Sequence, residues 1–313
     1  MAKAAHTTVD EARVPQGAFV RANGVPVHYV RSGSGPPVIY IHGAKSSVYD
    51  FTMSIAGDVA ARYTAVAFDR PGAGFSGRPP RAGGAPQAQA AILRAAAHTL
   101  GLERPILLGH SLGAAIALAW ALDAQDEVSA VVTLGGYVLP LGGPPPWVMA
   151  LMHSPAVLRG VGRIGRSRLG RPLVNGALRR AFYPDGVPAD YARITPALAL
   201  DDARLIYDGE DRKSAEDGLR ALAPRYADLR LPVVIVVGDQ DRMVPPRTSA
   251  RLHELLPHSE LVRLRDAGHM PQFTRPDAVL AAVDRAAELA SISRATELAD
   301  KRAHARAAGP ADA

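Results

Sequence analysis

The chain has 313 residues, 48% of them hydrophobic, so it can form one large domain or two small ones around a sizeable core. It contains no cysteine, which excludes disulfide bonds, thiolate catalysis and cysteine-ligated metal sites. The formal net charge of +6 affects solubility and non-specific attraction first, and we expect no nucleic-acid partner.

Strand-like and helix-like segments alternate along the chain, which is typical of an α/β protein. We expect strands at residues 17–22, 26–31, 37–41, 64–68, 105–109, 128–134, 232–237 and 259–264. We expect helices at residues 47–61, 85–100, 112–123, 246–256 and 275–290. Residues 32–35, Ser-Gly-Ser-Gly, predict a hairpin or a loop turn. Later strands are continuous apolar runs, so we predict a mostly parallel eight-stranded sheet flanked by helices.

The alternation stops between residues 138 and 225, where three consecutive prolines and an arginine cluster occur without a strand pattern. We interpret this segment as a helical cap inserted between two core segments, residues 1–137 and 226–292. A solvated face is the default interpretation of its arginines, with an acidic substrate or a membrane surface as the alternatives. Residues 293–313 form a tail, expected to be a frayed helix or disordered.

No apolar signal region is found at the N-terminus, and the longest apolar run, residues 106–122, is short for a membrane span. We therefore expect a cytoplasmic protein that is not integral to a membrane. The sequence leaves its oligomeric state open.

The most informative motif is Gly-His-Ser-Leu-Gly at residues 109–113, which lies between a predicted strand and a predicted helix. A serine on such a sharp turn is held in a strained backbone conformation with its hydroxyl above the sheet. In this context the motif predicts that Ser111 is a nucleophile.

A serine hydroxyl needs a base to take its proton and a third group to orient that base. In this architecture the acid and then the histidine follow the serine along the chain. Asp241 follows the strand expected at 232–237, and His269 follows the last expected strand. We predict His269 as the base and Asp241 as its orienting acid. Asp239 competes for the acid role, although a turn-forming role suits it better.

The loop after the strand at 37–41 should supply part of an oxyanion hole. Its small residues Gly43 and Ala44 let the backbone approach the substrate, so the amides of Ala44 and Leu112 are the predicted donors. His42 is a candidate base in its own right, but we prefer a structural role in bracing this loop. His42, Gly43, Trp147 and Tyr137 are the candidates for contact with substrate.

No metal site is expected, because the histidines lack metal-ligand spacing. Residues 160–165 match G-x-G-x-x-G, but they follow no predicted strand. A dinucleotide site needs that context, so we expect no such cofactor.

The chain resembles the α/β-hydrolase superfamily, in its cap-bearing serine esterase and haloperoxidase-like branch. The resemblance rests on His42-Gly43, on residues 69–76 (Asp-Arg-Pro-Gly-Ala-Gly-Phe-Ser), on the motif at 109–113, on the loop at 238–245 and on Gly268-His269. These run in family order over residues 17 to 290. The resemblance implies a cofactor-free active site beneath a variable helical cap. Dehalogenating and epoxide-opening members use an aspartate nucleophile, and Ser111 argues against both activities.

The sequence therefore predicts a serine hydrolase that cleaves a carboxylic ester of a small or medium apolar molecule. The same three residues could instead support lactone, amide or C–C bond hydrolysis, perhydrolysis or acyl transfer. A third hypothesis is a non-catalytic ligand-binding protein, because a fold alone does not establish chemistry.

Overall fold

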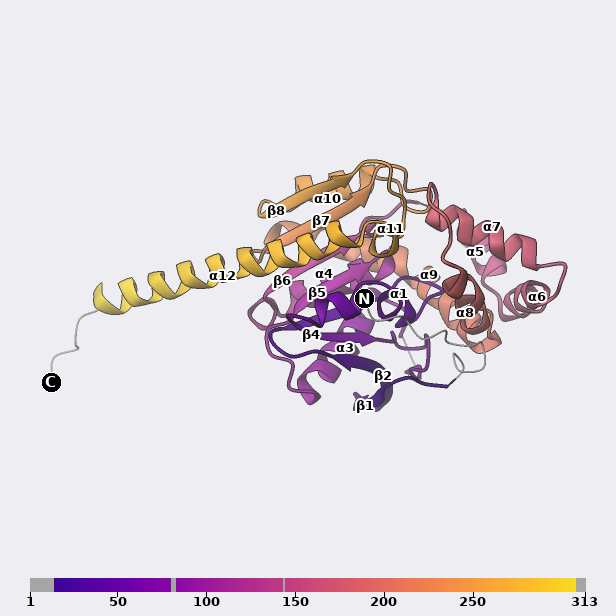
Figure 1. Ribbon diagram of the computed structural model, residues 1–313, viewed down its shortest axis with the longest axis horizontal. Coiled ribbons are helices and arrows are strands. Elements are labelled where there is room, and N and C mark those ends of the chain that lie inside the picture. Colours follow the sequence, from indigo (N-terminus) through magenta and orange to yellow (C-terminus); the bar gives the residue numbers. More distant parts are fainter. Residues whose placement is uncertain (1–13, 80–82, 143, 308–313) are drawn as a thin grey trace.

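The computed structural model describes residues 14–79, 83–142 and 144–307, which form a sheet between two layers of helices and a further group of helices at one end (Figure 1). The strands are β1 (Ala18–Ala22), β2 (Val25–Ser32), β3 (Pro37–Ile41), β4 (Thr64–Phe68), β5 (Ile106–His110), β6 (Ala130–Leu134), β7 (Val233–Gly238) and β8 (Ser259–Leu264). They form one eight-stranded sheet in the order β1-β2-β4-β3-β5-β6-β7-β8.

The pairings of β1 with β2 and of β2 with β4 are antiparallel, and all the others are parallel. The predicted mostly parallel sheet is therefore confirmed. Strands β4 to β7 are buried along their whole length because helices cover both faces, which explains their continuous apolar sequences.

The turn between β1 and β2 is a tight hairpin at Asn23 and Gly24, both with positive φ, as a two-residue hairpin of this kind requires. Residues 32–35 are not a hairpin, because β2 and β3 are not neighbours in the sheet. Ser32 ends β2, and residues 33–35 belong to the loop that carries the chain from β2 to β3, which was the other interpretation of this sequence.

Helices α3 (Pro86–Thr99), α4 (Leu112–Asp123) and α10 (Arg247–Leu255) pack in the core cluster on one face of the sheet. The other face is covered by α1 (Tyr49–Thr52), α2 (Ala56–Val59) and α12 (Pro276–Ala307). The short helix α11 (Pro271–Thr274) precedes α12. Helix α4 is buried from Leu112 to Leu122, so it lies at the centre of the molecule directly behind β5.

The single helix expected at residues 47–61 is wrong, since the chain forms α1 and α2 with a break after Thr52. In the break, the Ser54 hydroxyl donates to the Asp50 and Phe51 carbonyl oxygens. A serine that bonds to the preceding turn in this way competes with continued helix formation.

The described residues between β6 and β7 form five α-helices, which we call the inserted helices: α5 (Pro146–Met152), α6 (Pro155–Arg166), α7 (Arg171–Phe182), α8 (Ala189–Ala199) and α9 (Asp202–Leu222). A short 3-10 helix, Ala223–Asp228, follows them. They gather at one end of the sheet, on the right of Figure 1. Helix α12 projects from the opposite side, and the predicted tail from residue 293 belongs to this helix as far as Ala307. Residues 308–313 of the tail lie outside the described residues.

No helix within the described residues combines the length and the apolar character needed to cross a bilayer.

Candidate active site

Ser111 occupies the turn between β5 and α4 in a strained backbone conformation, with φ 53° and ψ −119°. Such a conformation costs a non-glycine residue on the order of 1–3 kcal/mol and persists only where the surroundings hold it. Two backbone hydrogen bonds do so: the Ser111 amide donates to the Leu134 carbonyl oxygen (2.9 Å), and the Tyr137 amide donates to the Ser111 carbonyl oxygen (3.0 Å).

The two glycines of the motif are required by close backbone contacts. A Cβ on Gly109 would clash with the backbone of Gly113, and a Cβ on Gly113 would clash with the Ile41 carbonyl group on β3. The strand-to-helix turn is therefore compressed against the neighbouring strand, which fixes the position of Ser111.

His269 and Asp241 form a buried pair beside this turn. The Asp241 Oδ2 atom lies 2.7 Å from His269 Nδ1, while Asp241 Oδ1 accepts hydrogen bonds from the amides of Met243 (2.7 Å) and Val244 (2.9 Å). A carboxylate only accepts hydrogen bonds, so the His269 Nδ1 atom that faces it carries a proton. The Nε2 atom of the same ring is then free to accept a proton. Burial lowers the pKa of His269, and the hydrogen bond from its ring to Asp241 partly opposes that shift.

Gly135, at the end of β6, makes room for this pair. Its φ is +50°, and a Cβ there would lie 3.1 Å from both Asp241 Oδ2 and His269 Nδ1. Asp239, the competing acid, is directed elsewhere: its Oδ1 accepts a 3.0 Å hydrogen bond from Arg263 Nε on β8. The structure thus brings Asp241, and not Asp239, to the histidine.

His110 links the serine turn to the histidine loop. Its Nε2 donates to the His269 carbonyl oxygen (2.9 Å), and the two imidazole rings lie 4.7 Å apart at their centroids. Gly43 lies against the same turn, because a Cβ on it would be 3.0 Å from Ser111 Cβ and 3.2 Å from His110 Nδ1. These contacts gather Ser111, His269 and the loop after β3 at one edge of the sheet. Within the described residues, the Ser111 hydroxyl makes no hydrogen bond with His269, a contact that often tightens only with substrate.

The two predicted oxyanion donors have free amides. In the described part of the chain, neither the Ala44 amide nor the Leu112 amide donates to a protein acceptor. The next amide, that of Lys45, is already used, because it donates to Asp208 Oδ1 on α9 (3.0 Å). Both predicted amides are therefore available as donors, and their role in an oxyanion hole stays a prediction.

His42 is fully buried and both its ring nitrogens are engaged. Nδ1 donates to the Gly43 carbonyl oxygen (2.8 Å), and Nε2 accepts a hydrogen bond from the Arg70 amide (3.0 Å). Burial lowers the pKa of His42 to about 4, with the nearby Arg70 charge acting in the same direction. A neutral ring with no free nitrogen supports the bracing role rather than contact with a substrate.

The other two candidates for substrate contact, Tyr137 and Trp147, have different surroundings from Gly43. The Tyr137 hydroxyl donates to Glu216 Oε1 on α9, so this side chain joins the core to the inserted helices. Trp147, on α5, is 71% exposed, and most of its surface faces solvent rather than the buried histidine and aspartate.

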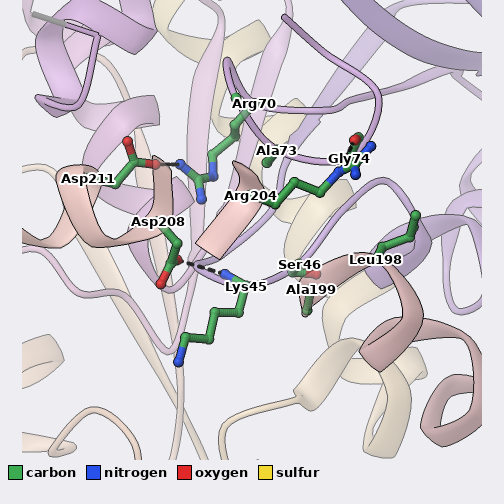
Figure 2. Close-up of a pocket in the computed structure, with 11 residues that line it drawn as sticks. Lys45, Ser46, Arg70, Ala73, Gly74, Leu198, Ala199, Arg204, Asp208 and Asp211 are labelled. Carbon is green, nitrogen blue, oxygen red and sulfur yellow. Dashed lines mark hydrogen bonds and ion pairs between the residues drawn. The ribbon is translucent and has the colours of Figure 1, made fainter. Parts of the chain in front are cut away.

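A buried ionic network fixes the loop after β3 to α9. The Arg70 guanidinium donates to the Gly43 carbonyl oxygen (3.1 Å) and to Gln89 Oε1 (2.8 Å). It also donates to Asp211 Oδ2 on α9 (2.7 Å), and Arg78 donates to the other oxygen of that carboxylate, Oδ1 (2.6 Å). Figure 2 shows Arg70 directed at Asp211 beside a cavity, with the Lys45 amide directed at Asp208. The cavity measures about 20 Å³, enough for about one water molecule, so it is not a substrate pocket.

Sequence reasoning missed the role of Asp50, which is buried on α1. Its Oδ1 accepts a 2.7 Å hydrogen bond from the Tyr191 hydroxyl on α8, and its Oδ2 lies 3.5 Å from His110 Nδ1. Burial alone would raise the pKa of Asp50, but the facing His110 lowers it below its ordinary value. The available signal was a carboxylate inside an apolar stretch, Val-Tyr-Asp-Phe at residues 48–51, which indicates a buried polar partner.

Comparison with known proteins identifies the family of the fold. The model of the α/β hydrolase fold family matches residues 36–276. A 2-hydroxy-6-oxononadienedioate/2-hydroxy-6-oxononatrienedioate hydrolase of Escherichia coli is 27% identical over 266 residues, covering 80% of this chain and 87% of that protein. An uncharacterized protein of Mycobacterium tuberculosis is 29% identical over 275 residues, covering 81% and 76% of the two chains.

Two solved structures share the fold. A 2-hydroxy-6-oxo-6-phenylhexa-2,4-dienoate hydrolase from Rhodococcus superposes with a TM-score of 0.72 at 23% identity, covering 87% of this chain and 98% of that one. A thermophilic esterase from Thermogutta terrifontis gives 0.66 at 19% identity, covering 88% and 99%. The chain therefore belongs to the α/β hydrolase fold family, and its relatives support a hydrolytic function.

Proposed function

We propose that this protein is a serine hydrolase that cleaves a carboxylic ester of a small or medium apolar molecule. The observation that carries the proposal is the Asp241–His269 hydrogen bond of 2.7 Å beside the strained Ser111 turn. The aspartate accepts the Nδ1 proton, which leaves Nε2 as the base and orients the ring.

In the proposed reaction, Ser111 Oγ attacks the ester carbonyl carbon while His269 Nε2 takes the serine proton. The negative charge that develops on the carbonyl oxygen is stabilised by the amides of Ala44 and Leu112, which donate to no acceptor in the part of the chain that the structure describes. His269 then gives its proton to the leaving alcohol as the C–O bond breaks, which produces an acyl-enzyme. A water molecule, deprotonated by His269, releases the acid and restores Ser111.

Cleavage of a C–C bond by the same residues is the second candidate. The Escherichia coli relative is named as a hydrolase of a hydroxy-oxo-dienedioate. Such a molecule holds ketone, enol and carboxylate groups but no ester, so the bond that its hydrolase breaks is a C–C bond. The similarity to that protein favours this alternative over lactone or amide cleavage, perhydrolysis and acyl transfer.

The proposal is tested by hydrolysis of a series of p-nitrophenyl esters, from acetyl to palmitoyl, by the wild type and by Ser111→Ala. We expect turnover to peak at short or medium acyl chains and to be lost in the variant. If the folded wild type shows no Ser111-dependent turnover of any ester, the ester proposal is wrong. A hydroxy-oxo-dienoate assayed next would then decide for or against the C–C alternative.

A further inference from the structure

Helices α5 to α7 carry an unbalanced positive charge. Residues 147–182 contain no aspartate or glutamate and seven arginines: Arg159, Arg163, Arg166, Arg168, Arg171, Arg179 and Arg180. Among the described residues only Arg166 of these forms an ion pair, with Asp202 on α9 at 2.8 Å. Across the described ranges the other six arginines have no carboxylate partner to neutralise them, which is unlike an ordinary solvated face of mixed charge.

The same three helices expose large apolar side chains. On α6, Val157, Val161 and Ile164 recur at intervals of four and three residues and are all exposed, so they form one row along the helix. The buried row of this helix is different: Leu158 and Gly162 lie against α9. Further exposed apolar residues lie on α5, on α7 and in the link between α6 and α7: Trp147, Leu151, Met152, Leu169 and Leu173. Leu169 is 90% exposed and Leu173 is 71% exposed. A gathering of this size on consecutive helices indicates an interaction surface, whereas single exposed apolar residues do not.

This surface, which we call the α5–α7 surface, lies at the outer end of the molecule. Figure 1 shows α6 and α7 at the extreme right, far from the projecting end of α12. Gly165, near the end of α6, lies against Val174 of α7, so the two helices contact each other there.

The surface also adjoins the candidate active site. Arg180 Nε donates to the Arg242 carbonyl oxygen (3.0 Å), one residue beyond Asp241, and the Arg242 guanidinium lies over the Tyr183 ring. An open groove of about 600 Å³ runs between these side chains, lined by Gly176, Arg179, Arg180, Tyr183 and Arg242. Three arginines line it with no carboxylate among its residues.

We propose that the α5–α7 surface docks the protein on an anionic lipid bilayer. Apolar side chains such as Trp147 and Val161 would enter the boundary between headgroups and acyl chains, and the arginines would contact lipid phosphates. An amphipathic helix with arginines on its polar face and an apolar row on the other is the combination that lies in a membrane interface. Long arginine side chains can reach the headgroups while their stems rest on apolar surface.

Charge complementarity favours the bilayer over the other occupants of such a surface. A second copy of the chain in a two-fold dimer would place this cationic surface against itself, because such interfaces use the same patch on both subunits. A nucleic acid would neutralise the arginines through its phosphates, but would leave the exposed apolar row without an apolar partner. An anionic membrane satisfies both features, because it offers phosphates to the arginines and acyl chains to the apolar row.

The test is co-sedimentation of the full chain with vesicles of phosphatidylcholine alone or with about one third phosphatidylglycerol. We expect strong binding only to the anionic vesicles. Arg159→Gln/Arg163→Gln should weaken it roughly 30-fold, since each arginine near an anionic surface contributes about 1 kcal/mol. Val161→Ser/Ile164→Ser should weaken binding to these vesicles at least tenfold.

The matched controls, which remove exposed residues of the same types elsewhere, are Arg31→Gln/Arg230→Gln and Val14→Ser/Ile292→Ser. Both should bind as the wild type does.

Circular dichroism and a thermal melt establish that each variant is folded before binding is compared. The proposal is wrong if the wild type binds neither vesicle, or if the control pairs weaken binding as much as the α5–α7 pairs. It is also wrong if light scattering shows a dimer that Val161→Ser/Ile164→Ser dissociates, or if a DNA duplex binds more tightly than the anionic vesicles. None of these readouts depends on catalytic activity, so they are independent of the proposed hydrolysis.

Discussion

The hydroxyl of Tyr191, on α8, donates a 2.7 Å hydrogen bond to the buried carboxylate of Asp50, on α1. Asp50 in turn faces His110, which precedes Ser111 and donates to the His269 carbonyl oxygen. The inserted helices are thereby connected through buried polar groups to both the serine turn and the histidine loop.

Loss of the Tyr191 hydroxyl should destabilise the protein. Tyr191→Phe leaves one oxygen of a buried carboxylate without its donor, and we expect a loss of about 1–3 kcal/mol in the free energy of unfolding. Tyr49→Phe is the matched control, because the buried Tyr49 hydroxyl has no hydrogen-bond partner among the described residues. Urea unfolding measures both variants. Equal losses in the two variants would contradict the assignment of a stabilising bond to Tyr191.

Asp241 and Asp239 should differ sharply in their effect on turnover. Asp241→Asn removes the group that holds His269 in the correct tautomer, and we expect turnover to fall on the order of 10⁴-fold. Asp239→Asn, in the same loop, loses only the contact with Arg263, at the surface, and should retain nearly all activity. Ester hydrolysis by the two folded variants tests this. Comparable losses would mean that the acid has been assigned wrongly.

Activity should rise with pH as the His269 ring loses its proton and becomes neutral. The histidine must be neutral to accept the serine proton, and burial lowers its pKa below the ordinary value of about 6.5. The midpoint of kcat/KM against pH should therefore lie below 6.5, with activity lost on the acid side. Asp241→Asn removes an interaction that raises this pKa, so its residual activity should have a still lower midpoint. A midpoint above 7 in the wild type would contradict this account of the site.

A methyl group at Gly43 should impair catalysis with little effect on the rest of the fold. The added Cβ would lie 3.0 Å from Ser111 Cβ and 3.2 Å from His110 Nδ1, which forces the nucleophile to shift. The neighbours must move by a few tenths of an ångström. Misplacement of a reacting group by about 1 Å can cost on the order of 10²-fold in rate, so we expect a smaller loss than that. Gly57→Ala is the control, since a Cβ there meets nothing within 4 Å, and it should retain activity. Full activity in Gly43→Ala would show that the loop after β3 is not close to the reacting atoms.

The strands were predictable because their apolar runs are bounded by turn residues, and β3, β4 and β8 have the predicted limits. The motif around Ser111 and the order of Asp241 and His269 followed from local sequence as well. The break between α1 and α2 did not, because it depends on a serine that bonds to the preceding turn. The sequence pattern of residues 47–61 is that of a helix whether or not this hydrogen bond forms, so the pattern does not reveal the break.

Long-range polar contacts were the other part that the sequence could not predict. Asp50 and Tyr191 are 141 residues apart, and nothing local to either residue identifies the other. The same holds for Arg70 and Asp211. Such pairs depend on how the inserted helices dock on the core, and that docking is decided by side chains from both parts together.

The most direct test of the central claim is to label the folded protein with a fluorophosphonate and locate the adduct by peptide mass spectrometry. Such a probe reacts with an activated serine whatever ester or C–C bond the protein cleaves. We predict a single adduct on Ser111, absent from Ser111→Ala and formed much more slowly in His269→Ala. A folded protein that forms no adduct on Ser111, or labels equally well without His269, would contradict the assignment of a histidine-activated serine nucleophile.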